Sequence, residues 1–141
     1  MPAIHPYQCV SNGESRQSIL VVDDEPFVLN TVAAVLEYAG YAVLRATSGP
    51  EALRVAAAFP RPIHLLLTDV RMPGMNGPRL ATQFSVLHPE SPCLFMAGFP
   101  EHPDLPESVR RNRASLLPKP FTPRVLLKAV QQALAPAVHT A

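Results

Sequence analysis

Three short apolar runs in this chain each end at charged residues, and this pattern constrains the fold more than any other feature of the sequence. A buried strand that ends at a charged residue delivers that residue to the edge of a sheet. The runs at residues 19–22, 65–68 and 116–118 lead respectively into Asp23 and Asp24, Asp69, and Lys119. If the strands are parallel neighbours, these four charged groups converge at one edge.

Apolar strand patterns alternate with helix patterns five times along the chain. The strand patterns cover residues 18–22, 41–46, 63–68, 92–97 and 114–117, and the helix patterns cover 26–39, 48–58, 77–87, 105–112 and 123–134. Strands that are continuously apolar, rather than alternating, indicate a sheet covered on both faces and therefore parallel. The sequence thus predicts an α/β fold with a doubly wound, five-stranded parallel sheet and helices on both faces.

Local signals place the ends of these helices. Gly40 is expected to end the first helix, and Ser48 with Glu51 has the pattern of a capping box for the second. Asn76 and Thr122 are expected to cap the third and the last helix. The helix predicted at residues 105–112 has the weakest pattern, because prolines crowd the segment before it.

Length and charge bound the class of protein. The chain has 141 residues and a formal charge of +1, and we expect one domain over residues 18–134 between a flexible tail at 1–17 and a short tail at 135–141. The balanced charge offers no basic field for nucleic acid and no polybasic segment for a membrane. Because no signal peptide or membrane-spanning run is evident, we expect a cytoplasmic protein.

The acids suit a hard divalent cation better than they suit zinc. Carboxylate oxygens are the ligands that Mg²⁺ prefers, whereas the histidines are scattered and Cys9 lies far from Cys93 in the sequence. We expect the histidines to be surface side chains, although His64 opens a strand and can face either way. Cys93 lies in an apolar run and is expected to be a small core residue.

Clustered carboxylates repel one another, and a bound Mg²⁺ together with the Lys119 ammonium would relieve that repulsion. The same two cations suit the charge that develops on a transferred phosphoryl group. Asp69 is the candidate nucleophile, because it follows the most apolar strand and precedes the loop at residues 72–77. A carboxylate that attacks phosphorus forms an acyl phosphate. The sequence therefore favours phosphoryl transfer to Asp69.

The same residues resemble the receiver domain of two-component response regulators. The matching segments are ILVVDDEP at 19–26, LLTDVRMPGMNG at 66–77 and LPKPFT at 117–122, and the resemblance spans about residues 18–134. It implies a CheY-like, flavodoxin-like fold with strand order 2-1-3-4-5. It also implies a phosphohistidine donor on a sensor histidine kinase or a histidine phosphotransfer protein. Such a domain is not an enzyme in the usual sense, since it catalyses only its own phosphorylation and dephosphorylation.

The resemblance assigns a role to each charged residue. Asp69 matches the phospho-acceptor, and Lys119 matches the lysine that pairs with the acceptor and then with its phosphoryl oxygen. Asp24 and Asp69 match the carboxylates that ligate Mg²⁺ directly, together with the backbone carbonyl of Arg71. Asp23 matches the acid that holds the metal through water.

Three further positions concern the surroundings of the acceptor. Pro120 matches a proline that is often preceded by a cis peptide bond, which helps to aim Lys119. Ala97 stands where the family normally has a Thr or Ser, and Leu116 stands where it usually has an aromatic switch residue. Both halves of the usual hydroxyl-and-ring coupling are absent, so we expect phosphorylation to remain possible and its readout to differ.

The leading hypothesis is a stand-alone receiver that relays its signal by binding a protein or by passing the phosphoryl group onward. Its start at Met1 and its tapering C-terminus are expected of a chain without an output domain. A pseudo-receiver that binds partners without phosphorylation is the alternative, supported by Ala97 and Leu116 and opposed by the intact acids. A haloacid-dehalogenase-type phosphatase is less favoured, because Arg71 occupies the position of that family's second acid.

Overall fold

The computed structural model describes residues 16–98 and 115–135, which form a five-stranded parallel sheet. The strands are β1 (Ser18–Val22), β2 (Ala42–Ala46), β3 (Leu65–Asp69), β4 (Cys93–Ala97) and β5 (Leu116–Pro118). Their order in the sheet is β2-β1-β3-β4-β5, and each neighbouring pair is parallel. The predicted fold class and strand order are therefore confirmed.

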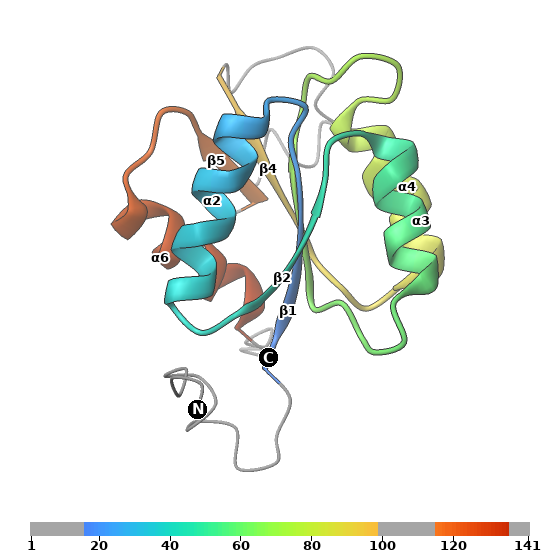
Figure 1. Ribbon diagram of the computed structural model, residues 1–141, viewed down its shortest axis with the longest axis horizontal. Coiled ribbons are helices and arrows are strands. Elements are labelled where there is room, and N and C mark those ends of the chain that lie inside the picture. Colours follow the sequence, from blue (N-terminus) through green and yellow to red (C-terminus); the bar gives the residue numbers. More distant parts are fainter. Residues whose placement is uncertain (1–15, 99–114, 136–141) are drawn as a thin grey trace, which may run out of the picture.

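Helices cover both faces of this sheet (Figure 1). Helices α2 (Pro26–Tyr38) and α6 (Pro123–Leu134) lie on one face, and α3 (Gly49–Ala58) and α4 (Gly77–Leu87) lie on the other. Successive side chains of a strand point to opposite faces, so strands that are apolar throughout need a helical layer on each side. The three-layer arrangement follows directly from the strand sequences.

Strand β1 shows this division residue by residue. Ile19 and Val21 pack in the core shared with α2 and α6, whereas Leu20 and Val22 pack in the core shared with α3 and α4. All four side chains are fully buried. Because burying a side chain of this size contributes about 1.5–3 kcal/mol, β1 is fixed near the centre of the sheet and the position of its carboxyl end is fixed with it.

The predicted helix ends agree closely with the structure. The side chains of Asn76 and Thr122 accept hydrogen bonds from the backbone N–H groups of Arg79 and Val125, which confirms both as N-caps. Gly40 follows the C-cap of α2 with a φ of 105°, a conformation that glycine adopts most easily.

The cap of α3 differs from the expected capping box. The Ser48 hydroxyl oxygen accepts a hydrogen bond from the Glu51 N–H, as predicted. The Glu51 carboxylate, however, accepts hydrogen bonds from the N–H and the hydroxyl of Thr47 instead of the N–H of Ser48. Thr47 offers two donors, and its backbone N–H is the largest cause of the lowered pKa of Glu51. The reciprocal bond is therefore displaced by one residue.

Strand β3 begins at Leu65, two residues later than predicted, and His64 lies just before it. The ring Nδ1 of His64 accepts a hydrogen bond from the Ser18 N–H at 2.9 Å, and the His64 N–H donates to the Ser18 carbonyl at 2.8 Å. His88 is also half-buried, with its Nε2 3.2 Å from the Ala56 carbonyl oxygen. The expectation of a surface side chain is therefore wrong for His88, whereas the direction of His64 was left open and its side chain is half-buried.

Other predictions differ in detail or lie outside the described residues. Strand β5 begins at Leu116, two residues later than predicted. Cys93 is half-buried rather than fully buried, and burial raises the pKa of its thiol to about 11. The helix predicted at 105–112 and Cys9 lie outside the described residues. Within the described ranges, no helix is long and apolar enough to span a bilayer.

Candidate functional site

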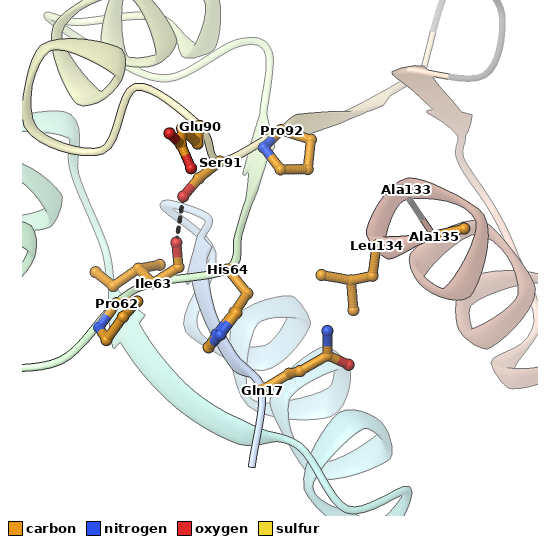
Figure 2. Close-up of a pocket in the computed structure, with 10 residues that line it drawn as sticks. All are labelled: Gln17, Pro62, Ile63, His64, Glu90, Ser91, Pro92, Ala133, Leu134 and Ala135. Carbon is orange, nitrogen blue, oxygen red and sulfur yellow. Dashed lines mark hydrogen bonds between the residues drawn. The ribbon is translucent and has the colours of Figure 1, made fainter. Parts of the chain in front are cut away.

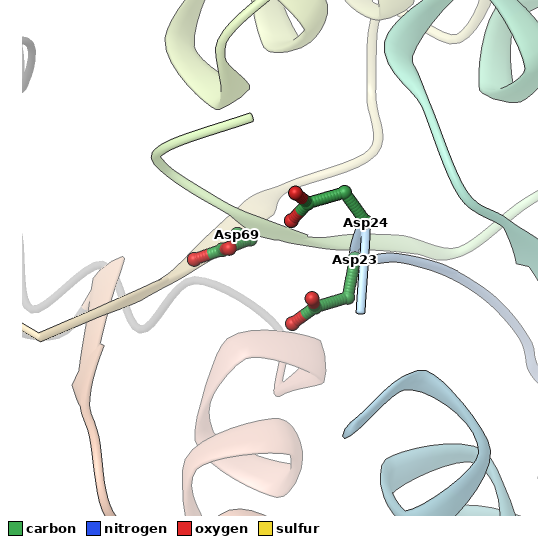
Figure 3. A group of neighbouring side chains, drawn as sticks. All are labelled: Asp23, Asp24 and Asp69. Carbon is green, nitrogen blue, oxygen red and sulfur yellow. The ribbon is translucent and has the colours of Figure 1, made fainter. Parts of the chain in front are cut away.

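The predicted acids and lysine come together at the carboxyl edge of the sheet. Asp23 directly follows β1, Asp69 is the last residue of the adjacent β3, and Lys119 follows β5. One carboxylate oxygen from each of Asp23, Asp24 and Asp69 lies within 4.8 Å of the others (Figure 3). They converge because the carboxyl ends of parallel strands share one edge of the sheet.

The Lys119 ammonium bridges two of these acids. Its Nζ lies 3.3 Å from Asp23 Oδ2 and 3.2 Å from Asp69 Oδ1. The side chain of Asp23 is 0% exposed, and those of Asp69 and Lys119 are 13% and 28% exposed. The other Asp23 oxygen, Oδ1, accepts the Glu25 N–H at 2.9 Å. Asp23 is therefore held in place and in turn holds the Lys119 ammonium beside Asp69.

One lysine does not neutralise this group of acids. Burial is the largest cause of the raised pKa of Asp69, and the charges of Asp23 and Asp24 raise it further against the opposing effect of Lys119. Burial alone would lower the pKa of Lys119, but the Asp69 and Asp23 carboxylates together outweigh burial and raise that pKa. The ammonium therefore stays charged, and the site favours a further cation.

Gly77 folds the loop after β3 back against the backbone of Asp69. The Gly77 N–H donates a hydrogen bond to the Val70 carbonyl at 2.8 Å, and a Cβ at Gly77 would lie 2.3 Å from the Asp69 carbonyl oxygen. Only glycine allows so close an approach. Sequence reasoning assigned Gly77 to a loop without this role, although the Asn76-Gly77 pair is a turn signal that points to it.

Arg71 lies exposed in the same loop, two residues after Asp69. A hollow of about 360 Å³ opens beside it, lined by Arg71, Met72, Pro73 and Asn76. Arg71 therefore borders space that a small partner could enter.

The two expected switch positions are filled by buried apolar side chains. Ala97 and Leu116 are 3% and 6% exposed, and they share one cluster with Val70 and Phe95. Phe95 pairs in register with Leu116 across β4 and β5. This part of the site therefore presents no hydroxyl from Ala97 and no ring from Leu116.

Lys119 is tied to the end of β4 through its backbone. The Lys119 N–H donates a hydrogen bond to the Ala97 carbonyl at 2.8 Å. The peptide bond between Lys119 and Pro120 is cis, the geometry that the family resemblance implied.

A larger hollow lies at the opposite edge of the sheet (Figure 2). It has a volume of about 550 Å³ and opens at the amino ends of β1, β3 and β4, beside the C-terminal end of α6. Its lining includes Gln17, His64, Glu90, Ser91 and Leu134. Asp23, Asp24 and Asp69 do not line it, so the larger of these two hollows is not the one beside the clustered acids.

Comparison with known proteins agrees with the geometry of the acidic edge. A family model described as the response regulator receiver domain matches residues 19–131. The chain belongs to the response regulator receiver domain family. The receiver protein CpdR of Brucella abortus is 32% identical over 123 residues, which cover 84% of this chain and 98% of CpdR.

Two further relatives show the same domain in different settings. The sensor kinase CckA of Brucella abortus is 31% identical over 117 residues, which are 83% of this chain but only 12% of CckA. The structure of the chemotaxis protein CheY4 of Vibrio cholerae superposes with a TM-score of 0.73 at 29% identity, covering 85% of this chain and 100% of CheY4. This receiver thus has the CheY-like fold.

Membership of the family establishes the general function. Receiver domains of two-component systems are signalling modules that accept a phosphoryl group, and they are not enzymes in the usual sense. They interact with sensor kinases or phosphotransfer proteins, and they generally bind Mg²⁺ through an acidic pocket. In this chain, Asp23, Asp24 and Asp69 form a group of neighbouring acids.

Proposed function

We propose that this receiver accepts a phosphoryl group on Asp69 from a phosphohistidine on a sensor histidine kinase or a histidine phosphotransfer protein. The observation that carries the proposal is the position of Asp69, which ends β3 beside two further acids and 3.2 Å from the Lys119 ammonium. Asp69 is partly accessible, whereas Asp23 is fully buried, so Asp69 is the better placed of these two for attack on an incoming phosphorus atom.

The transfer exchanges one bond to phosphorus for another. An Asp69 carboxylate oxygen forms a bond to phosphorus while the bond between phosphorus and the donor's imidazole nitrogen breaks, and that nitrogen leaves with the electron pair. The Lys119 ammonium pairs first with the Asp69 carboxylate and then with a phosphoryl oxygen, whose negative charge it neutralises. Asp23 remains as the buried partner that keeps Lys119 at the site.

The donor set fits Mg²⁺, because three carboxylates face one ammonium and hard cations prefer oxygen ligands. Asp24, Asp69 and the Arg71 carbonyl would hold the ion directly, and Asp23 would hold it through water. When bound, Mg²⁺ supplies the positive charge that the acids and the incoming phosphoryl group require.

We also propose that the receiver domain extends over residues 18–134, with tails at 1–17 and 135–141, and that it works in the cytoplasm. It removes its own phosphoryl group by hydrolysis. It relays its signal by protein–protein interaction or by onward phosphotransfer.

Acetyl phosphate provides a direct test because it needs no partner kinase. Incubated with acetyl phosphate and Mg²⁺, the wild-type protein is expected to gain one phosphoryl group, detected by intact-protein mass spectrometry. The adduct should be sensitive to hydroxylamine, as an acyl phosphate is, and should be absent when EDTA replaces Mg²⁺. No adduct with Mg²⁺, or equal labelling in EDTA, would show the proposal to be wrong.

A pseudo-receiver that works without phosphorylation remains the second candidate. The buried apolar pair at Ala97 and Leu116 favours it, because both usual switch residues are missing. A calorimetric titration with Mg²⁺ separates the two candidates. Saturable binding by the acidic group favours the phosphorylated receiver, and no binding favours the pseudo-receiver.

Restoring the missing hydroxyl should strengthen the response to phosphorylation. We expect Ala97→Thr to enlarge the amide chemical-shift changes that follow phosphorylation by acetyl phosphate, because a hydroxyl at the end of β4 can bond a phosphoryl oxygen on Asp69. Ala97→Val is the matched control, since valine has the shape of threonine without the hydroxyl. If the Thr and Val variants respond alike, the hydroxyl does not act as expected.

A further inference from the structure

The loop that follows the acceptor is fixed at three points, and one of them lies away from the acids. Met72 is 8% exposed and packs into the core shared with α3 and α4. Gly77 lies against the Asp69 carbonyl, as described above. Met75 lies between them and reaches the first residue of α3, because a Cβ added at Gly49 would lie 2.5 Å from Met75 Sδ.

The contact between Met75 and Gly49 is close along much of the side chain. The same added Cβ would lie 2.9 Å from both Cβ and Cγ of Met75. Gly49 is buried and is the first residue of α3. Its φ is not left-handed, so glycine is needed here because a side chain would collide with Met75, and not because of the backbone conformation. The Met75 side chain thus rests directly on the Gly49 Cα.

A tight turn directly precedes Met75 in the loop. The Met75 N–H donates a hydrogen bond to the Pro73 carbonyl at 3.0 Å, and Gly74 has a φ of 82°. Arg71 lies at the start of the same short loop, between the buried Val70 and Met72, and Gly77 holds the far end of the loop at Asp69. Met75 anchors the middle of the loop to the start of α3.

We propose that Met75 is a positioning residue for the phosphoryl-transfer site, and that by resting on Gly49 it holds the loop that carries Arg71. The inference rests on the proposed function, which assigns the Arg71 carbonyl to Mg²⁺. Met75 touches none of the reacting atoms in this account. Its effect is exerted through the geometry of the loop.

The test measures Mg²⁺ affinity by isothermal titration calorimetry beside the rate of labelling by acetyl phosphate. Met75→Ala is expected to weaken Mg²⁺ binding about tenfold, the low end of the range for residues that orient metal ligands. At saturating Mg²⁺ its labelling rate should approach that of the wild type, because the nucleophile and Lys119 are untouched. Met75→Leu should lie nearer to the wild type, since it conserves volume.

Gly49→Ala reaches the same contact from the other side. The added methyl group displaces Met75, so this variant should also weaken Mg²⁺ binding. Adding Met75→Ala to Gly49→Ala should weaken binding by less than the two single effects together, because the two residues act through one contact. Val86→Ala, at a side chain on α4 that is 79% exposed, is the control and should bind Mg²⁺ as the wild type does.

The outcomes separate this inference from the proposed function. If the wild type is labelled and binds Mg²⁺ while Met75→Ala and Gly49→Ala keep the wild-type affinity, Met75 has no positioning role. If Met75→Leu is as defective as Met75→Ala, or if saturating Mg²⁺ does not restore the labelling rate, the effect is general destabilisation and the inference is wrong. If the wild type itself neither binds Mg²⁺ nor is labelled, the proposed function fails.

Discussion

Asp69→Asn is expected to lower labelling by acetyl phosphate by on the order of 100-fold or more, because an amide does not replace a carboxylate nucleophile. The amide keeps the size of the side chain, so the change removes the nucleophile while leaving the packing at the end of β3 intact. Intact-protein mass spectrometry in the presence of Mg²⁺ measures the effect.

The same variant should be at least as stable as the wild type in EDTA, which excludes unfolding as the cause of lost labelling. Burial and the neighbouring acids raise the pKa of Asp69 above 3.8, its ordinary value. A carboxyl with a raised folded-state pKa contributes stability fully below its unfolded pKa and loses that contribution as pH rises through the folded pKa. At pH 7 the charged Asp69 carboxylate therefore destabilises the metal-free fold. Asparagine removes this destabilisation, so the thermal unfolding midpoint of the variant should be equal to or higher than that of the wild type.

Glu90→Gln is the control for the loss of one acid, because Glu90 is an exposed acid at the opposite edge of the sheet. It should be labelled as the wild type is. Undiminished labelling of Asp69→Asn would place the adduct on another residue.

Lys119→Met is expected to destabilise the metal-free protein by about 2–3 kcal/mol. Removing one partner of a buried ion pair typically costs about 3–5 kcal/mol, and the partial exposure of Lys119 reduces that figure. The cost arises because the fully buried Asp23 carboxylate loses the ammonium at 3.3 Å. Urea unfolding in EDTA measures it, and labelling at Asp69 should slow in the same variant.

Two companion variants test the reason for that loss. Adding Asp23→Asn to Lys119→Met should recover stability, because it removes the unpaired buried charge. Arg45→Met breaks the exposed pair with Glu37, in which both side chains are 38% exposed, and should cost no more than about 1 kcal/mol. Equal stability of Lys119→Met and the wild type would mean that the pair with Asp23 contributes nothing.

Much of the fold and the gathering of the site could be predicted because both depend on short local patterns. Strands that are apolar on both faces specify a covered parallel sheet, and an acid placed directly after such a strand can lie only at the carboxyl edge. Asp23 follows β1 and Asp69 ends the adjacent β3, so their proximity to Lys119 could be predicted from the strand order alone, without knowledge of side-chain rotamers. The N-caps at Asn76 and Thr122 were equally local.

The details that could not be predicted depend on contacts between distant residues. Nothing in the sequence near His64 indicates that its ring accepts the Ser18 N–H, or that Met75 needs a residue without a side chain at Gly49. The displaced cap at Thr47 depended on which of two nearby donors the Glu51 carboxylate reaches. The pattern also left open whether buried Ala97 and Leu116 leave the site able to signal.

Reductive mapping of the adduct tests the central claim most directly. Borohydride converts an acyl phosphate on aspartate to homoserine, which peptide mass spectrometry can assign to one position. After incubation with acetyl phosphate and Mg²⁺, we predict homoserine at position 69 and at no other acid, with none formed in EDTA. Homoserine at position 23 or 24, or a phosphoryl group found on a histidine, would contradict the assignment of Asp69 as the acceptor.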